Sequence, residues 1–132
     1  MQKLSSRVEV AQSYRLSDYK IAVLIPCYNE EITIGQVVRA FRAELPTARV
    51  YVYDNRSSDR TVNEAQQAGA IVGFEPRPGK GHVVRRMFAD IDADIYIMVD
   101  GDHTYEATAV KQLIDRLVDE NLDMVVGARQ PS

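Results

Sequence analysis

Two aspartates separated by one glycine are the residues whose types and spacing first suggest chemistry. Asp100 and Asp102 flank Gly101 directly after the apolar run Ile95–Val99. If that run is a strand, side chains two residues apart point to the same side, so both carboxylates could face one ligand. Hard carboxylate oxygens suit Mg²⁺ or Mn²⁺, and Gly101 lets a ligand approach the backbone closely. The alternative is a solvated turn in which Asp102 or Thr104 caps the next helix.

A lysine between two glycines is the second candidate. Lys80 lies between Gly79 and Gly81 at the expected start of a helix. Free backbone N–H groups, the positive end of the helix dipole and the ammonium group together suit a phosphate. The spacing of the glycines matches neither a Walker A loop nor a dinucleotide-binding fingerprint. A surface turn with a solvated lysine is the alternative.

A third acidic position ends another apolar run. Asp54 follows Val50–Tyr53 and begins the segment DNRSSD. A carboxylate at a strand end can accept hydrogen bonds from a base or a ribose. We expect Ser58 and Asp59, later in the same segment, to cap the following helix.

Other polar residues have structural interpretations. Glu30 and Glu31 are expected to open the first helix, where negative charge is favourable. Cys27 is expected to be a small packed residue. Arg85 and Arg86 are expected to be solvated on the polar side of a helix. The histidines of the chain, His82 and His103, receive no chemical role because no Ser or Cys nucleophile motif accompanies them.

These candidates must be positioned by strands that alternate with helices. Apolar runs predict strands at Ile21–Ile25, Val50–Tyr53, Ala70–Phe74, Ile95–Val99 and Met124–Val126. Helical spacing predicts helices from Glu31 to before Pro46, over Asp59–Ala68 before Gly69, around Val83–Ile91 and around Val110–Val118. This alternation predicts an α/β fold with a mostly parallel sheet covered on both faces. Ligands of such sheets bind beyond the carboxyl ends of the strands, where the polar loops gather.

Composition excludes several classes of protein. A chain of 132 residues is long enough for one domain. Its net charge of −3 argues against a protein whose main task is to bind nucleic acid through the phosphates. One cysteine can form neither an internal disulfide nor a Cys-based zinc site. No apolar run approaches the roughly 20 residues of a membrane span, and the N-terminus lacks the apolar core of a signal peptide. We therefore expect a cytoplasmic protein with an arm over residues 1–19 and one domain over residues 20–132.

Taken together, the motifs resemble those of family 2 glycosyltransferases of the GT-A fold, and within that family the polyprenyl- and dolichyl-phosphate sugar synthases. The resemblance runs from about Ile21 to Arg129. It rests on IPCYNEE (25–31), DNRSSDRT (54–61), RPGKGHVVRRMF (77–88), VDGDHTY (99–105) and VVGAR (125–129). It implies a nucleotide-diphospho-sugar transferase fold that is Rossmann-like. It also implies that the acceptor-binding half of the family's domain is absent, leaving a truncated, donor-binding part.

The resemblance assigns a role to each matching residue. The residues that would bind the donor are Pro26, Tyr28 and Glu30 at the nucleoside, Asp54 at the base, Lys80 and Asp100 along the ribose and diphosphate, and Arg129 at the diphosphate or acceptor. Asp102 would hold Mg²⁺ or Mn²⁺, with Asp100 as the second candidate ligand. The metal would neutralise the leaving diphosphate, and Lys80 would add electrostatic stabilisation, so Asp102 and Lys80 are the predicted catalytic residues.

The implied reaction is metal-dependent transfer of a sugar from GDP-mannose or a UDP-sugar. The implied acceptor is a lipid phosphate of the polyprenyl or dolichyl type, or a glycan; a lipid phosphate needs no general base because it is already an anion. The resemblance also implies peripheral association with the inner face of the membrane. Without an acceptor half, we expect the isolated chain to transfer sugar weakly or not at all.

An unpaired sheet edge beyond Met124–Val126 predicts self-association, most simply as a dimer. Two other functions remain open at this point. One is a sugar-nucleotide pyrophosphorylase, although PCYNEE lacks the glycine-rich loop of that class. The other is a non-catalytic nucleotide-binding or assembly module.

Overall fold

A five-stranded sheet forms the centre of the protein. In a computed structural model, the described residues are 18–101, 109, 111–112, 115–116 and 124–126. The strands are β1 (Ile21–Cys27), β2 (Arg49–Asp54), β3 (Ile71–Phe74), β4 (Ile95–Met98) and β5 (Met124–Val126), and the helices are α2 (Ile34–Glu44), α3 (Thr61–Ala68) and α4 (Lys80–Asp90). The sheet has the order β3-β2-β1-β4-β5, and every neighbouring pair is parallel. The predicted α/β fold is therefore confirmed.

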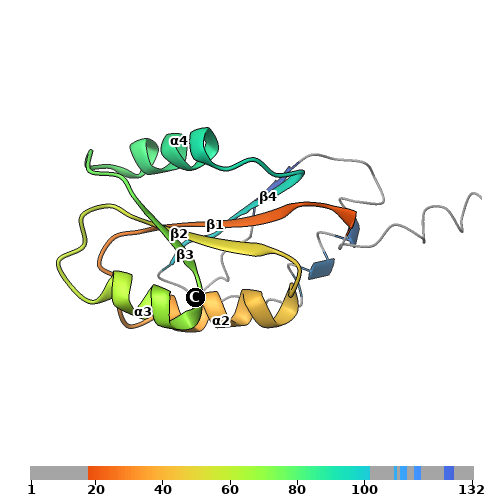
Figure 1. Ribbon diagram of the computed structural model, residues 1–132, viewed down its shortest axis with the longest axis horizontal. Helices are drawn as coiled ribbons and strands as arrows, with labels where there is room; N and C mark the ends of the chain where they lie inside the picture. The colour runs from red at the N-terminus through yellow and green to blue at the C-terminus, as the bar shows by residue number, and fades with distance from the viewer. Residues whose placement is uncertain (1–17, 102–108, 110, 113–114, 117–123, 127–132) are drawn as a thin grey trace, which may run out of the picture.

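The layers follow from the alternation of side chains along β1. Figure 1 shows α2 and α3 on one side of the sheet and α4 on the other. Val23 and Ile25 belong to the core shared with α2 and α3, whereas Ala22 and Leu24 belong to the core shared with α4. All seven residues of β1 are buried, as a continuous apolar run predicts for a strand covered on both faces.

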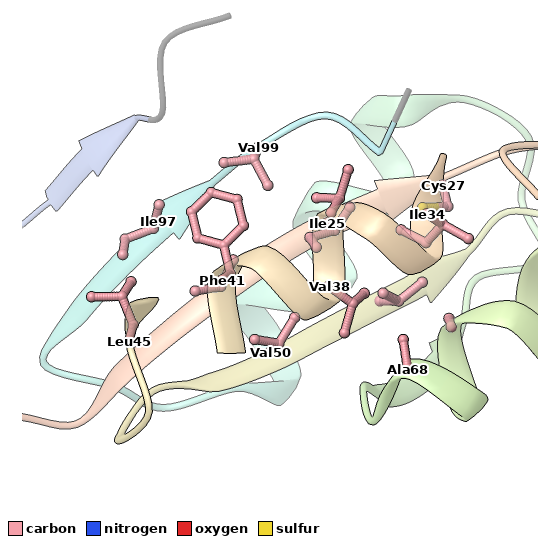
Figure 2. Packing of buried hydrophobic residues seen from close by; sticks show 14 of the residues in the cluster. Ile25, Cys27, Ile34, Val38, Phe41, Leu45, Val50, Ala68, Ile97 and Val99 are labelled. Carbon is pink, nitrogen blue, oxygen red and sulfur yellow. The ribbon is translucent and has the colours of Figure 1, made fainter. Parts of the chain in front are cut away.

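The larger core lies between the sheet and α2. Phe41 and Val38 of α2 are fully buried among residues of β1, β2 and β4 (Figure 2). Their spacing on one face of the helix is the pattern from which the helix was predicted. Among the described helices, none combines the length and the apolar character that a membrane span needs.

The start of α2 differs from the prediction. The helix begins at Ile34, and no acidic residue lies in its first turn. Glu30 and Glu31 instead form a turn before it, in which the Glu30 carboxylate accepts a hydrogen bond from the Tyr28 N–H at 2.7 Å. The Glu31 N–H donates to Asp59 at 3.3 Å, and the Ile34 N–H donates to the Glu30 carbonyl at 2.9 Å, so this turn is attached both to the next loop and to the helix.

The start of α3 confirms one expected cap and contradicts the other. The Asp59 carboxylate accepts a hydrogen bond from the Thr61 N–H at 2.9 Å. Desolvation opposes ionisation of Asp59, but hydrogen bonds from the Thr61 hydroxyl and N–H outweigh it and lower the pKa of the carboxyl. Ser58 does not cap the helix, because its N–H and hydroxyl both donate to Asn29 Oδ1, at 2.9 and 3.4 Å.

The end of α3 is stabilised by the neighbouring helix. Gly69 adopts a left-handed conformation with φ 101°, as expected for a glycine that ends a helix. Arg42 of α2 donates to the Ala68 carbonyl at 3.0 Å. Its guanidinium occupies the space that a Cβ at Gly69 would need, with Nη1 at 2.1 Å.

Helix α4 is attached to the sheet through Tyr53 of β2. The Tyr53 hydroxyl donates to Asp90 at 2.8 Å. Burial, followed by this hydrogen bond, raises the pKa of Tyr53 to about 12. The Tyr53 ring lies over Gly73 of β3, where a Cβ would come within 2.5 Å of Cζ. A side chain at Gly73 would therefore displace the ring.

A buried glutamate holds the loop between β3 and α4. The Glu75 side chain is 1% exposed, and its carboxylate accepts hydrogen bonds from the N–H of Arg77 at 2.7 Å, from Arg77 Nε at 3.1 Å and from Arg86 Nε at 3.1 Å. The hydrogen bonds from Arg77, joined by that from Arg86, lower the pKa of Glu75 to about 2. The expectation that Arg86 is merely solvated is therefore wrong. Its partner lies eleven residues away in sequence, at the far end of the loop.

We predict that Gly69→Ala destabilises the protein by about 1–2 kcal/mol, the cost of a Cβ in the left-handed region. Arg42 would also have to leave the Ala68 carbonyl. Gly81→Ala is the matched control, because a Cβ there meets nothing within 4 Å and Gly81 lies in α4. Alanine should stabilise that helix by about 0.5–1 kcal/mol. Urea unfolding of both variants measures the contrast, and equal effects would contradict it.

We predict that Glu75→Gln lowers the free energy of unfolding at pH 7 and that this loss shrinks in acid. The folded pKa of Glu75, about 2, lies below its usual 4.5, so its stabilisation is complete above pH 4.5 and disappears as the pH falls toward 2. Urea unfolding at several pH values measures the difference between wild type and variant. Glu64→Gln, at an exposed 3.9 Å ion pair with Arg60, is the control and should change stability little. A difference that stays constant down to the lowest pH would refute the prediction for Glu75.

Candidate functional site

A cleft of about 280 Å³ lies beyond the carboxyl ends of β1, β2 and β4, against the start of α4. Parallel strands place all their carboxyl ends at one edge of the sheet, so the loops that follow them meet there. The residues that line the cleft are Pro26, Cys27, Tyr28, Glu30, Asn55, Lys80, Val83, Asp100 and Gly101. The walls are therefore a mixture of apolar, acidic and basic groups.

Most of the donor-binding residues implied by the sequence lie together in this cleft. Pro26, Tyr28 and Glu30 reach it from β1 and the following turn. Lys80 reaches it from the first turn of α4, and Asp100 from the segment after β4. Residues separated by more than seventy positions in the sequence are thus brought to one site.

Lys80 and Asp100 form an ion pair across the cleft. Lys80 Nζ lies 2.6 Å from Asp100 Oδ1. The Lys80 side chain is 60% exposed and the Asp100 side chain 28% exposed, so solvent and ligands can reach both charges. The predicted phosphate-binding cation and the predicted acidic ligand are therefore direct partners when no ligand is bound.

Asp54 is not among the residues that line the cleft. The side chain is buried, and Oδ2 accepts a hydrogen bond from the Ser57 N–H at 3.0 Å. Oδ1 is buried and has no hydrogen-bond partner among the residues that the structure describes. The structure therefore does not bring the Asp54 carboxylate, the predicted ligand of the base, to the surface of the cleft.

Asn55 lines the cleft in place of Asp54 and was not among the predicted site residues. Its amide donates to the carbonyls of Glu75 and Arg77 at 2.8 and 2.7 Å, and its Oδ1 accepts from the Gly79 N–H at 2.9 Å. An amide that both donates and accepts can fix a loop in this way. The sequence signal was its position immediately after Asp54, at a strand end.

A second cavity of about 460 Å³ adjoins the cleft at Tyr28, Asn55 and Lys80. Arg56 and Pro78 are among its other lining residues. Arg56 has φ 66°, a left-handed conformation that is uncommon for a residue other than glycine. No local sequence pattern indicates this cavity, because it forms among three loops that are distant in the chain.

The loops after β1 and β2 are also joined directly. Asn29, with φ 52°, donates its N–H to the Ser57 hydroxyl at 2.8 Å. Asparagine tolerates this left-handed conformation better than most residues. The rim that carries Tyr28 is therefore fixed to the loop that carries Arg56.

Gly101 has a packing role in addition to the one expected. A Cβ at Gly101 would lie 2.6 Å from Cys27 Sγ and 3.3 Å from Ile25 Cγ2. The absence of a side chain is therefore required by the protein's own packing, not only by the approach of a ligand. The same contacts confirm the expectation that Cys27 is a small packed residue.

The remaining predicted site residues, Asp102 and Arg129, lie outside the described residues, as do His103 and Thr104. Within the described ranges, no group of three His, Cys, Asp or Glu side chains could hold a metal ion. Asp100 does fit a divalent cation in one respect. It presents a hard carboxylate oxygen at the cleft, and the Lys80 ammonium already occupies a cation position on that oxygen.

Comparison with known proteins identifies the family. The model of glycosyl transferase family 2 matches residues 22–132. Protein RfbJ of Shigella flexneri is 54% identical over 112 residues, which are 85% of this chain and 87% of that protein. The glycosyltransferase AglJ of Haloferax volcanii is 42% identical over 110 residues, which cover 83% of this chain and 36% of that protein.

A solved structure agrees with the sequence comparison. Glucosyl-3-phosphoglycerate synthase from Mycobacterium tuberculosis, solved with Mn²⁺, UDP and phosphoglyceric acid, has a TM-score of 0.70 and 28% identity. The match covers 86% of this chain and 42% of that one. The chain thus spans most of RfbJ but less than half of AglJ and of the synthase. The chain belongs to glycosyl transferase family 2, a family of enzymes, and has the fold of its nucleotide-sugar transferases.

Proposed function

We propose that the protein transfers a sugar from a nucleoside-diphosphate sugar to a lipid phosphate of the polyprenyl or dolichyl type. The observation that carries the proposal is the cleft at the strand ends, in which Tyr28, Glu30, Lys80 and Asp100 meet. An aromatic ring, acidic acceptors and an ammonium group are the groups that a nucleoside and a diphosphate require. Family membership favours a transferase over the pyrophosphorylase alternative.

The donor would lie along the cleft, with its diphosphate at Lys80 and Asp100. The unpaired Oδ1 of Asp54 would accept a hydrogen bond from the base, and Tyr28 and Glu30 would contact the nucleoside. Lys80, at the start of α4, would bind the diphosphate with an ammonium group reinforced by the helix dipole.

Asp102 and Asp100 would hold the divalent metal, either Mg²⁺ or Mn²⁺. When bound, the metal would neutralise charge on the leaving diphosphate. The metal and UDP present in structures of the mycobacterial synthase support this part of the proposal by similarity. Arg129 would face the diphosphate or the acceptor.

The acceptor distinguishes this proposal from the reaction of the mycobacterial synthase. That protein was solved with phosphoglyceric acid, a small soluble phosphate. A lipid phosphate offers the same anionic nucleophile and needs no general base.

Cytoplasmic location at the membrane surface and a dimeric state belong to the same proposal. In the described sheet, β3 is an edge strand that carries exposed Phe74 and Ile71.

We predict that transfer from GDP-mannose or UDP-glucose to polyprenyl phosphate, weak in the 132-residue chain, depends on Mn²⁺. Labelled donor with and without EDTA measures it. Because the metal supplies several kcal/mol of charge stabilisation, Asp102→Ala should lower turnover about 100-fold or more. Asp92→Ala, at an acidic residue that is 94% exposed outside the cleft, is the matched control. Transfer to 3-phosphoglycerate alone would overturn the acceptor assignment. Donor binding without release of nucleoside diphosphate from any donor would favour a binding module.

We predict that Asp54→Ala weakens the binding of nucleosides and nucleotides alike, whereas Lys80→Ala weakens only ligands that carry phosphate. A hydrogen bond to a charged group contributes about 1.5–3 kcal/mol, so each loss should be roughly ten-fold or more. Calorimetric titration with guanosine, uridine, GDP and UDP measures both effects. Equal losses of nucleoside affinity in the two variants would contradict this division of roles.

A further inference from the structure

We propose that Thr33 is a positioning residue of the donor cleft. Its hydroxyl fixes the segment after β4, which carries Asp100 and Gly101, to the turn before α2. Thr33 does not itself line the cleft, so it acts through the residues that do. The inference rests on the proposed function, because it takes the cleft as the place where the diphosphate of the donor binds.

The first step is a hydrogen bond between residues that are 68 positions apart in the sequence. The Thr33 hydroxyl donates to the Gly101 carbonyl at 2.6 Å, in a partly buried position. This distance lies within the ordinary range for a hydroxyl donor and an oxygen acceptor. The carbonyl belongs to the planar peptide that joins Gly101 to Asp102, so the bond fixes the direction in which the chain leaves Gly101.

The second step is that this hydroxyl does not cap its own helix. Thr33 is the N-cap residue of α2, a position at which a threonine side chain ordinarily accepts a hydrogen bond from an N–H of the first turn. The structure describes every residue of that turn, and the Thr33 side chain makes no such bond with any of them. The hydroxyl is therefore committed to the segment after β4.

The third step is the freedom of the residue that the hydroxyl holds. A glycine has no side chain to restrict its backbone, so its orientation must come from its surroundings. Gly101 is buried, and a Cβ there would meet Cys27 Sγ at 2.6 Å and Ile34 Cδ1 at 3.3 Å. Figure 2 shows Cys27 and Ile34 close together at the start of α2. This packing restrains where Gly101 lies, and the bond from Thr33 restrains how its carbonyl points.

Thirty-three thus joins the two walls of the cleft through one residue, Thr33. Its N–H donates to the Glu30 carbonyl at 3.2 Å, in the turn that also carries Tyr28, and its hydroxyl holds the segment that carries Asp100. When the hydroxyl bond is lost, Gly101 samples other orientations, and only a fraction of the molecules hold this wall in the arrangement that binds the donor. The apparent affinity for the donor falls by that fraction.

The first measurement uses Cys27, the one cysteine of the chain, as a probe that needs no ligand. Its side chain is 2% exposed and lies against Gly101. Thr33→Val removes the hydroxyl at nearly constant shape, so local opening of the Gly101 segment should become about two- to ten-fold more frequent, the range for one neutral hydrogen bond. The rate at which the thiol reacts with the disulfide reagent DTNB should rise by that factor. Thr33→Ser keeps the hydroxyl and should react as the wild type does.

The second measurement is calorimetric titration of the same variants with UDP, GDP, uridine and guanosine. Thr33→Val should bind the diphosphate that the wild type prefers about two- to ten-fold more weakly, because the same bond is lost. Its affinity for the matching nucleoside should be unchanged, since Thr33 bonds the turn of Tyr28 and Glu30 only through its backbone. Thr33→Ser should bind both ligands as the wild type does.

Val37→Ala is the matched control for stability. Val37 is a buried residue of the same helix, so its truncation destabilises the core and leaves the bond between Thr33 and Gly101 in place. Any gain in thiol reactivity then comes from global unfolding, which exposes much surface and rises steeply with urea. The gain in Thr33→Val should depend weakly on urea, because local opening exposes little surface. Val37→Ala should bind the diphosphate as the wild type does.

The outcomes separate this inference from the proposed function. Unchanged thiol reactivity in Thr33→Val, or the same gain in Thr33→Ser, would overturn the restraint on Gly101. A gain in reactivity with unchanged diphosphate affinity, or an equal loss of diphosphate and nucleoside affinity, would overturn the positioning role. A wild type that binds neither UDP nor GDP would overturn the proposed function and the positioning role with it. The thiol measurement would then still decide whether Thr33 restrains Gly101.

Discussion

The burial of β1 on both faces is the constraint on which the rest of the structure depends. Its parallel neighbours β2 and β4 satisfy its backbone, and helices cover both faces, so the strand can be neither displaced nor shifted by one residue. A shift of one residue would exchange the core facing α2 for the core facing α4. This fixed register sets where the carboxyl end of each strand stops, and with it the positions of Tyr28, Asp54 and Asp100.

Buried polar groups fix the positions of the loops relative to the strand ends. Asn55 and Glu75 lie at the ends of adjacent strands. Asn55 hydrogen-bonds the carbonyls of Glu75 and Arg77 and the Gly79 N–H, all in the loop before α4. Glu75 accepts hydrogen bonds from the Arg77 N–H and from the Arg86 guanidinium. A buried polar network is stable when each member has a partner, and it then permits one arrangement of the backbone. The start of α4, and therefore Lys80, is positioned by these contacts together with the apolar packing of Val83 and Met87.

The charged groups inside the cleft differ in solvent exposure from the charged group that holds the neighbouring loop. Glu75 is inaccessible and has several donors, whereas the Lys80–Asp100 pair is open to solvent. Hydrogen-bonded walls with solvent-accessible charges suit a site that binds an anionic donor. The unpaired Oδ1 of Asp54 fits the same arrangement, because a ligand could satisfy an acceptor that the described residues leave without a partner.

The sequence determined the order and type of the elements, since apolar periodicity reports which faces are buried before any long-range contact is known. The strands, the end of α3 at Gly69 and the gathering of polar loops at one edge followed from that periodicity and from turn chemistry. The start of α2, the partner of Arg86, the role of Asn55 and the packing reason for Gly101 did not. Each depends on a contact between segments distant in the chain, such as Gly101 against Cys27. Local patterns carry no information on such contacts, so the tertiary structure alone decided how the loops are fixed and which charges of the cleft meet.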